Sequence, residues 1–260
     1  MGKIIAIANQ KGGVGKTTTA VSLSAYLAAE GFQVLLVDMD PQGNATSGIA
    51  VRAKEKTSYE VLINHVLMDS AIVKTGIPNL YALPSDIRLA AAEVELVGVI
   101  QREKQLREAI LPVRESYDFI LIDCPPSLSL LTINALTAAD SVLVPIQCEY
   151  FALEGVSALM NTISRVQKSL NPHLQLEGVV LTMFDGRTNL SLLVADEVKK
   201  HFKGKVFLSI IPRSVRLGEA PSHGLPIGLY DPRSAGAEAY RNLAREIIGI
   251  RDPERRMNRL

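Results

Sequence analysis

A glycine-rich octapeptide near the start of the chain constrains the fold more than any other feature. The run Lys-Gly-Gly-Val-Gly-Lys-Thr-Thr at 11–18 follows the apolar run Ile-Ile-Ala-Ile-Ala at 4–8. The apolar run predicts a buried β-strand, and the alanine-containing segment 20–29 predicts a helix. Glycines let backbone N–H groups turn inward around an anion, and the positive end of the following helix adds to the attraction. The sequence therefore predicts a strand, a phosphate-binding loop and a helix in succession.

The loop departs from the usual phosphate-loop spacing at one position. The pattern G-x-x-x-x-G-K-[ST] is met at Gly15, Lys16 and Thr17, but Gln10 stands where the first glycine is expected. Lys11 adds a second positive charge to the loop. We expect Lys16 to contact the β- and γ-phosphates of a nucleotide and the Thr17 hydroxyl to bind a magnesium ion. The residues expected to surround the phosphates are Lys11, Gly12, Gly13, Val14, Gly15, Lys16, Thr17 and Thr18.

Short apolar runs alternate with helical stretches along the rest of the chain. Runs that are apolar throughout, such as Phe119–Ile122, suit a parallel sheet buried on both faces. Because strands alternate with helices, we predict an α/β fold with a doubly wound, mostly parallel sheet flanked by helices. The predicted strands span 3–8, 33–38, 79–82, 119–122, 141–145, 176–182 and 205–208. The predicted helices span 16–30, 57–63, 89–97, 101–113, 129–138, 155–170, 190–201 and 235–248.

Length and composition favour one domain in a reducing compartment. With 260 residues, 47% of them hydrophobic, we expect 1–250 to form a single domain and the polar, basic tail 251–260 to be disordered. The net charge of +1 gives no global attraction to nucleic acid, so such binding would need a local patch. Cys124 and Cys148 lie in apolar segments and favour free thiols in the cytoplasm. The longest apolar runs are of strand length, so we expect no membrane span and no signal peptide.

Three aspartates follow predicted strands, at the positions where open α/β sheets bind ligands. Asp38 and Asp40 come after the apolar run 34–37, and Asp123 comes after 119–122. One aspartate there would usually be a turn or a helix cap, but three beside a phosphate loop favour a functional site. Mg²⁺ prefers carboxylate ligands and keeps several waters, so we expect Asp123 and Asp38, with Thr17, to form the magnesium site.

The run KGGVGKTTT at 11–19 resembles the deviant Walker A motif of the ParA/MinD class of P-loop ATPases. The run 119–123 has the Walker B pattern of four apolar residues followed by Asp. The resemblance implies ATP and Mg²⁺ as cofactors and a homodimer in which Lys11 reaches the partner's phosphates. Asp40 matches the catalytic aspartate that orients or polarises the attacking water. The catalytic residues implied are thus Asp40, Lys11 and Lys16, and hydrolysis should be slow unless the protein dimerises.

Segment 125–129, Pro-Pro-Ser-Leu-Ser, is expected to form a loop over the phosphates, because two prolines cannot continue a sheet ladder. The family resemblance makes this loop a switch that senses the γ-phosphate. The alternative is a plain turn between a strand and a helix.

Segments 181–189 and 211–221 resemble parts of the short Soj-type ParA proteins. The resemblance places Met183, Pro212 and Arg213 beside the adenine. The usual Asn and Ser of the family are replaced by Ser214 and Gly218, so we expect any nucleotide contact from position 214 to use the backbone.

Basic residues near these segments suggest a surface for DNA. Arg187 and Arg216 match arginines that contact DNA in the Soj branch of the family. Lys199, Lys200 and Lys203 would extend the patch, although lysines at a helix end also offset the helix dipole. Such contacts would be made to phosphates of double-stranded DNA, without sequence preference.

The whole resemblance implies a chromosome- or plasmid-partitioning ATPase in the cytoplasm, associated with the nucleoid. A ParB-type centromere-binding protein would stimulate hydrolysis and so release the dimer from DNA.

Three other functions use a similar loop. A MinD-like membrane-associated cell-division ATPase needs a C-terminal amphipathic helix, whereas the tail 251–260 carries only Met257 and Leu260 as large apolar residues. A nitrogenase-type iron protein needs cluster cysteines, and Cys124 and Cys148 lack an iron–sulfur spacing. A metabolic ligase is the third alternative. The MinD-like function is the main rival, and no membrane partner is expected.

Overall fold

The computed structural model describes residues 2–150 and 152–251. The strands in these ranges are β1 (Lys3–Ile7), β2 (Val34–Asp38), β3 (Val73–Lys74), β4 (Leu80–Leu83), β5 (Phe119–Asp123), β6 (Ser141–Gln147), β7 (Gln175–Phe184) and β8 (Val206–Pro212). They form one sheet in the order β3-β4-β2-β5-β1-β6-β7-β8. Every neighbouring pair is parallel except β3 and β4, which are antiparallel. The prediction of a doubly wound, mostly parallel sheet is confirmed.

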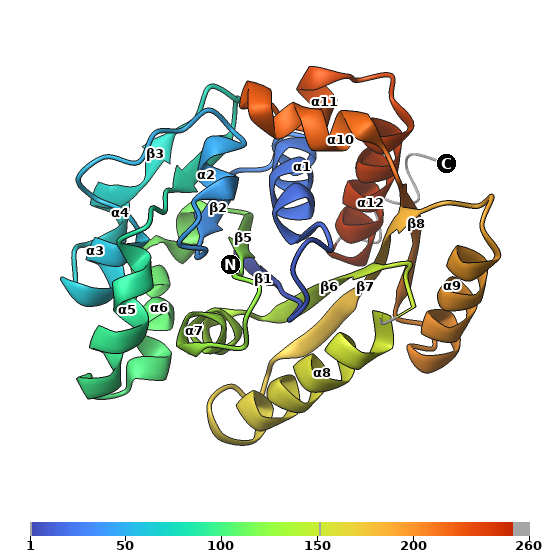
Figure 1. The fold of residues 1–260 in the computed structure, drawn as a ribbon. Helices are drawn as coiled ribbons and strands as arrows, with labels where there is room; N and C mark the ends of the chain where they lie inside the picture. The colour runs from blue at the N-terminus through green and yellow to red at the C-terminus, as the bar shows by residue number, and fades with distance from the viewer. Residues whose placement is uncertain (1, 151, 252–260) are drawn as a thin grey trace.

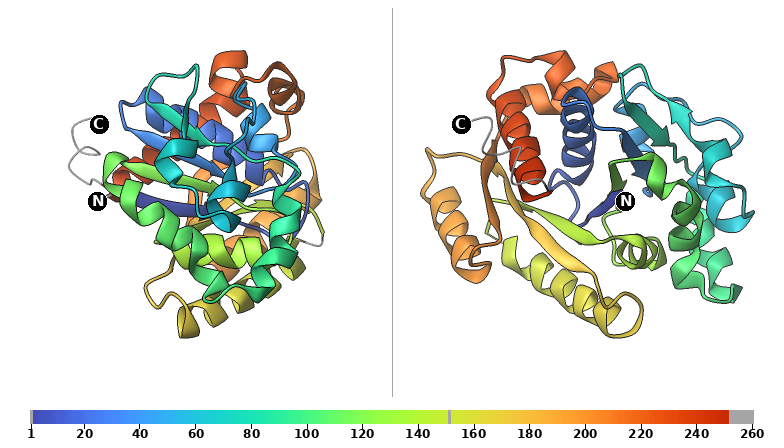
Figure 2. Two further views of the ribbon diagram at one scale, coloured as in Figure 1. Left: turned by 90° about the vertical axis from the view of Figure 1, so that its left-hand side faces the viewer. Right: turned by 180° about the vertical axis from the view of Figure 1, so that it is seen from behind.

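Helices cover both faces of this sheet. They are α1 (Lys16–Ala29), α2 (Asn44–Ser47), α3 (Ser58–Ile63), α4 (Met68–Ala71), α5 (Leu89–Glu95), α6 (Gln105–Ile110), α7 (Leu130–Ala138), α8 (Ala152–Ser169), α9 (Asn189–His201), α10 (Val215–Glu219), α11 (Ile227–Tyr230) and α12 (Ala235–Arg251). Figure 1 shows α1 and α12 above the sheet and α7 and α8 below it, and the view from behind in Figure 2 shows the same layers. Within the described ranges, no helix has both the length and the apolar character that a bilayer crossing requires.

Each central strand contributes side chains to two separate cores. In β1, Ile4 and Ala6 face one hydrophobic cluster, while Ile5 and Ile7 face the other. The first core lies against α3 to α9 and the second against α1, α2, α10, α11 and α12. A strand buried on both faces must be apolar at nearly every position, which explains the continuous apolar runs of the sequence.

The helix predicted over 101–113 and two of the predicted strands differ most from the observed elements. The single helix expected over 101–113 is instead three short turns: η2 (Arg102–Lys104), α6, and η3 (Leu111–Ser116). Pro112 lies in the first turn of η3, where its missing N–H and its ring interrupt an α-helix. Strands β7 and β8 run beyond their predicted ends, to Phe184 and Pro212. Of the predicted tail, 252–260 lie outside the described residues.

The register of the strands brings the predicted site residues to one edge. Asp123 on β5 pairs with Asp38 on β2 and with Ile7 on β1. The phosphate loop leaves β1 directly after Ile7, so both carboxylates and the loop lie at the carboxyl edge of the sheet. At the other side of the same edge, Phe184 on β7 pairs with Pro212 on β8.

Candidate functional site

The phosphate loop has a backbone that requires glycine. Gly13 and Gly15 have φ angles of 72° and 89°, in the left-handed region where a side chain is strained. Gly15 is the N-cap of α1, directly before its first residue Lys16. The carbonyl of Val14 accepts a hydrogen bond of 2.8 Å from the Thr182 hydroxyl on β7, which fixes the loop to the sheet. The loop thus leads directly into the start of a 14-residue helix, where backbone N–H groups and the helix dipole favour an anion.

Lys16 lies inside this loop and not on the surface. Its side chain is buried, and its Nζ donates to the Lys11 carbonyl at 3.0 Å. Burial lowers the pKa of the Lys16 ammonium, while the negative charges of Asp123 and Asp40 oppose the shift. A buried ammonium held beside two carboxylates is placed to compensate phosphate charge at the edge of the sheet.

The surroundings of the Asp123 carboxylate are those expected at a magnesium site. The residue is fully buried, and neither carboxylate oxygen has a regular hydrogen-bond partner among residues 2–150 and 152–251. Burial raises the pKa of Asp123 well above its usual value, and the neighbouring Asp38 raises it further, while the Thr17 hydroxyl favours the ionised form. An unpaired buried carboxylate is costly unless a cation joins it. Carboxylate and hydroxyl oxygens are ligands that Mg²⁺ prefers, so the donor set fits the ion.

The protein supplies only part of a metal coordination shell here. In the described part of the chain, no three His, Cys, Asp or Glu side chains gather in a way that could hold a metal ion. A magnesium ion beside Asp123 would therefore take its other ligands from phosphate and water, as is usual for Mg²⁺ at nucleotide sites.

Asp38 is buried beside Asp123 but its oxygens are already bonded. Its Oδ1 accepts from the Asp40 backbone N–H at 3.1 Å, and its Oδ2 accepts from the Thr46 N–H and hydroxyl at 2.8 and 2.7 Å. Burial raises the pKa of Asp38 to about 6 against these hydrogen bonds. Asp38 thus anchors the segment that follows β2. Its expected contact with magnesium-bound water stays a prediction.

Asp40 lies in the turn that Asp38 anchors. Its side chain is almost fully buried, and its Oδ1 accepts from the Gln42 N–H at 2.9 Å. Gly43 closes the turn with a φ of 62°, and a Cβ there would lie 2.9 Å from the Ser85 carbonyl oxygen. The turn is therefore fixed from both sides, and its charge already acts on the Lys16 ammonium.

Three hydroxyl and amide groups from distant segments support this turn. The Thr46 hydroxyl, besides donating to Asp38, accepts from the Ser85 N–H at 2.9 Å. The Ser58 hydroxyl donates to the Asp38 carbonyl at 2.5 Å. Sequence reasoning missed these residues, because nothing in the sequence indicates which distant segments meet.

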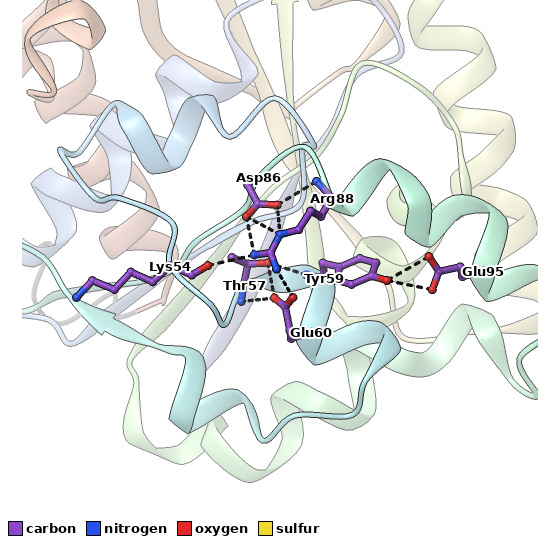
Figure 3. Close-up of polar contacts among 7 residues, drawn as sticks. All are labelled: Lys54, Thr57, Tyr59, Glu60, Asp86, Arg88 and Glu95. Atoms are coloured by element: carbon purple, nitrogen blue, oxygen red, sulfur yellow. Dashed lines mark hydrogen bonds and ion pairs between the residues drawn. The ribbon is translucent and has the colours of Figure 1, made fainter.

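A polar cluster beside the turn holds α3 and α5 together, as Figure 3 shows. Arg88 pairs with Glu60 at 2.6 Å and with Asp86 at 2.7 Å. Thr57 and Glu60 form a reciprocal cap at the start of α3, and Tyr59 donates to a carboxylate on α5. Since Ser58 belongs to the same α3 turn, the cluster stabilises the support of the Asp40 segment.

Segment 125–129 lies against the phosphate loop. A Cβ added at Gly12 would meet the Pro126 Cβ at 3.9 Å. The Thr132 hydroxyl donates to the Ser127 carbonyl at 2.6 Å and holds the segment at the start of α7. The segment forms the expected loop beside the phosphate loop, while its position over the phosphates and its role as a γ-phosphate switch stay predictions.

Lys11, unlike Lys16, is partly exposed at the edge of the site. Its Nζ lies 3.6 Å from Glu149 Oε2, and Glu149 also pairs with Arg213 at 3.1 Å. Its backbone N–H donates to the Asn9 side chain at 3.0 Å. Glu149 was missed by the sequence analysis, although it comes two residues after β6, near the same strand edge as Asp38 and Asp123. The contact of Lys11 with a partner subunit stays a prediction.

The three residues expected beside an adenine line one cavity. Met183, Pro212 and Arg213 enclose a space of about 210 Å³ together with Gly15 and Thr18 of the phosphate loop. The pairing of Phe184 with Pro212 brings the two segments together across β7 and β8. The cavity therefore adjoins the start of α1, where a base connected to bound phosphates would lie.

The basic residues expected to contact DNA divide into two groups. Arg187 follows β7 and Arg216 lies on α10 just after β8. Both arginines therefore lie shortly after the ends of two neighbouring strands. Lys199, Lys200 and Lys203 lie at the far end of α9, a 13-residue helix of about 20 Å. The structure thus brings the arginines to one edge of the sheet and separates them from the lysines.

Comparisons with known proteins agree with this geometry. Residues 2–176 match a family model described as an AAA domain. The chain is 59% identical over 249 residues to the sporulation initiation inhibitor protein Soj of Bacillus subtilis, covering 95% of this chain and 98% of that protein. It is 52% identical over 250 residues to the chromosome partitioning protein ParA of Caulobacter vibrioides, covering 95% and 94%.

Solved structures with nucleotides share the fold. A cobyrinic acid a,c-diamide synthase from Mycobacterium smegmatis, with bound ATP analogue and magnesium, has a TM-score of 0.87 at 38% identity, covering 97% of this chain and 96% of that chain. The septum site-determining protein MinD from Pyrococcus horikoshii, with Mg-ADP, has a TM-score of 0.82 at 28% identity, covering 97% and 98%.

Proposed function

Because the chain belongs to the Soj/ParA family of chromosome-partitioning ATPases, we propose that it uses ATP and Mg²⁺ to drive DNA partitioning as a nucleotide-dependent homodimer. The observation that carries the proposal is the buried, unpaired carboxylate of Asp123 beside the phosphate loop and Lys16. The identity of 59% to a Soj protein exceeds the 38% to the diamide synthase and the 28% to MinD, which favours partitioning over either alternative.

At the phosphates, the residues act by position and charge. The loop N–H groups and Lys16 would hold the β- and γ-phosphates, and Thr17 and Asp123 would hold the metal. Magnesium, when bound, neutralises charge that develops on the phosphates. Asp40, held in its turn by Asp38, would orient the attacking water. Met183, Pro212 and Arg213 would enclose the adenine in the adjoining cavity.

In the homodimer, each subunit would supply its Lys11 to the nucleotide site of its partner. Lys11 is exposed enough to leave Glu149 and reach the terminal phosphate held by a partner subunit. An ion pair at 3.6 Å on the surface contributes little, so this exchange costs little. Hydrolysis would remove the shared γ-phosphate and weaken the association of the subunits.

The dimer would hold double-stranded DNA without sequence preference, through Arg187 and Arg216. Lys199, Lys200 and Lys203 would be outer contacts. Binding to the chromosome would place the protein on the nucleoid in the cytoplasm. A ParB-type centromere-binding protein would stimulate hydrolysis and release the dimer. We assign these steps to one domain formed by residues 1–250.

Light scattering tests the proposal directly. We expect the molar mass to double when ATP and Mg²⁺ are added and to rise further with plasmid DNA, but not with ADP. Lys16→Ala removes the buried ammonium at the phosphates, so nucleotide binding measured by calorimetry should weaken by at least about 100-fold. Tight ATP binding by Lys16→Ala would refute the assignment of the loop. A mass that stays monomeric in ATP would refute the dimer.

A further inference from the structure

Each arginine proposed to contact DNA is held by a carboxylate of its own chain. Arg187 is 88% exposed, yet its Nε and Nη2 donate to the two oxygens of Asp185 at 2.9 and 2.7 Å. The Arg187 backbone N–H donates to the same carboxylate at 3.1 Å. These hydrogen bonds lower the pKa of Asp185 to about 2, so the carboxylate is charged at any physiological pH. The guanidinium is therefore fixed in a bidentate ion pair.

Arg216 is held in a similar way by two carboxylates. Its Nη1 lies 3.0 Å from Glu219 Oε2, and its Nε lies 3.5 Å from Asp231 Oδ2. The Tyr230 hydroxyl donates to the same Glu219 oxygen at 3.1 Å, which keeps that carboxylate in place. Arg216 thus has acidic partners on both sides of its guanidinium.

The two ion-paired groups belong to the same surface. Arg213, between them in sequence, donates its backbone N–H to the Phe184 carbonyl at 3.0 Å, which joins the loops after β7 and β8. The surface thus combines two arginines with three carboxylates. A DNA phosphate approaching either arginine meets a negative charge at contact distance, within the screening length of physiological salt.

We propose that Asp185 on one loop, and Glu219 with Asp231 on the other, are counter-charges that DNA phosphates must displace from Arg187 and Arg216, and so limit the strength of DNA binding. The inference rests on the proposed DNA contacts of these arginines. Exposed ion pairs are weak, so the closely spaced phosphates of a duplex can displace the carboxylates from the arginines. Each displaced carboxylate stays close by and repels the DNA backbone. A single subunit would then bind DNA weakly. A dimer would bind DNA more tightly, because it presents Arg187 and Arg216 twice.

The isosteric variant Asp185→Asn tests this most sharply. An asparagine oxygen still accepts from the Arg187 N–H, so the turn is kept while the charge is lost. With one pair released in each subunit, we expect the ATP-bound dimer to bind non-specific duplex DNA about 2- to 30-fold more tightly. The slope of log affinity against log salt should also steepen, by up to about two units per dimer. Thermal melting of each variant checks that it is folded.

Glu103→Gln is the matched control for net charge. It removes the same charge from a partly exposed ion pair, since Glu103 lies 3.1 Å from Arg102 on η2. Figure 1 shows α6, which directly follows η2, and α9 on opposite sides of the molecule. This variant should leave the DNA affinity and the salt slope as in the parent protein. Equal tightening by Glu103→Gln and Asp185→Asn would reduce the effect to net charge and overturn the proposal.

Two further variants separate this inference from the proposed function. Arg187→Ala should weaken DNA binding, and Asp185→Asn combined with Arg187→Ala should bind more weakly than Asp185→Asn alone, because the asparagine relieves the repulsion but cannot replace the lost phosphate contact. If Arg187→Ala binds DNA as the parent does, the DNA contact itself is wrong and the inference falls with it. If Arg187→Ala weakens binding while Asp185→Asn does not tighten it, the DNA contact stands and the counter-charge role alone is overturned.

Discussion

At the scale of residues, Asp38 and Asp123 occupy paired positions but have different surroundings. Both are buried at adjacent strand ends, yet Asp38 accepts hydrogen bonds from two neighbouring residues while both Asp123 oxygens lack a regular partner in the described ranges. A buried carboxylate with its oxygens satisfied is an anchor, and one without partners calls for a cation. The two aspartates that sequence reasoning treated alike thus have separate physical roles.

Thr46 should be a positioning residue for the hydrolytic turn. Thr46→Val keeps the side-chain shape but removes the hydroxyl between Asp38 and the Ser85 N–H. We expect kcat for ATP hydrolysis to fall about tenfold with a smaller change in KM, because Asp40 loses its fixed geometry. Thr46→Ser restores the hydroxyl and should restore kcat. Steady-state ATPase assays decide this, and equal losses in the valine and serine variants would show that only packing is involved.

Asp40 should be needed for hydrolysis but not for ATP binding. Removing the carboxylate in Asp40→Ala should lower the hydrolysis rate by at least about 100-fold, while the phosphate loop still holds ATP. The ATP-bound dimer would then accumulate. Gel filtration in ATP and Mg²⁺ measures this, with Lys16→Ala as the non-binding control. Elution of Asp40→Ala as a monomer would contradict the catalytic role.

At the scale of elements, a buried hydrogen bond joins α1 and α12, which both cover the phosphate-loop side of the sheet. The Thr19 hydroxyl on α1 and the Tyr240 hydroxyl on α12 lie 3.1 Å apart. Both residues are buried, and burial raises the pKa of Tyr240. Because α1 carries the phosphate loop at its start, this contact ties the loop's helix to the far end of the chain.

Tyr240→Phe should therefore destabilise the fold without creating a cavity. Loss of one buried hydroxyl pair should lower the free energy of unfolding by about 0.5–1.5 kcal/mol, and more if the Thr19 hydroxyl stays unpaired. Urea denaturation measures the change. The double variant Tyr240→Phe with Thr19→Val removes both hydroxyls and should be less destabilised than the two single variants added together. Strict additivity would mean that the two hydroxyls do not interact.

The elements also show what a sequence can and cannot predict. The apolar runs predicted all of the central strands, and the glycine loop and Asp123 were placed correctly, because burial on both faces leaves a strong pattern. The helix expected over 101–113 was wrong, since Pro112 divides it. Contacts such as Lys11 with Glu149, or Thr46 with Ser85, depend on which loops meet in three dimensions. The local sequence pattern does not indicate which loops contact each other.

At the scale of the whole molecule, a net charge of +1 means that the proposed DNA binding would need a local surface. If a dimer contacts about 4–8 phosphates, log affinity should fall against log salt with a slope of about −4 to −7 in ATP. Fluorescence anisotropy with duplexes of unrelated sequence measures both the slope and the absence of preference. A flat salt dependence, or a large difference between sequences, would contradict phosphate contacts through Arg187 and Arg216.

The cavity beside the phosphate loop shares its walls with the two arginine-bearing loops. Met183 lines it four residues before Arg187, and Arg213 lines it three residues before Arg216. Because the adenine of ATP is proposed to lie in this space of about 210 Å³, a small compound bound there would compete with the nucleotide and displace the stems of both loops. Such a compound would lower ATP binding and DNA binding together, and raising the ATP concentration should reverse both effects.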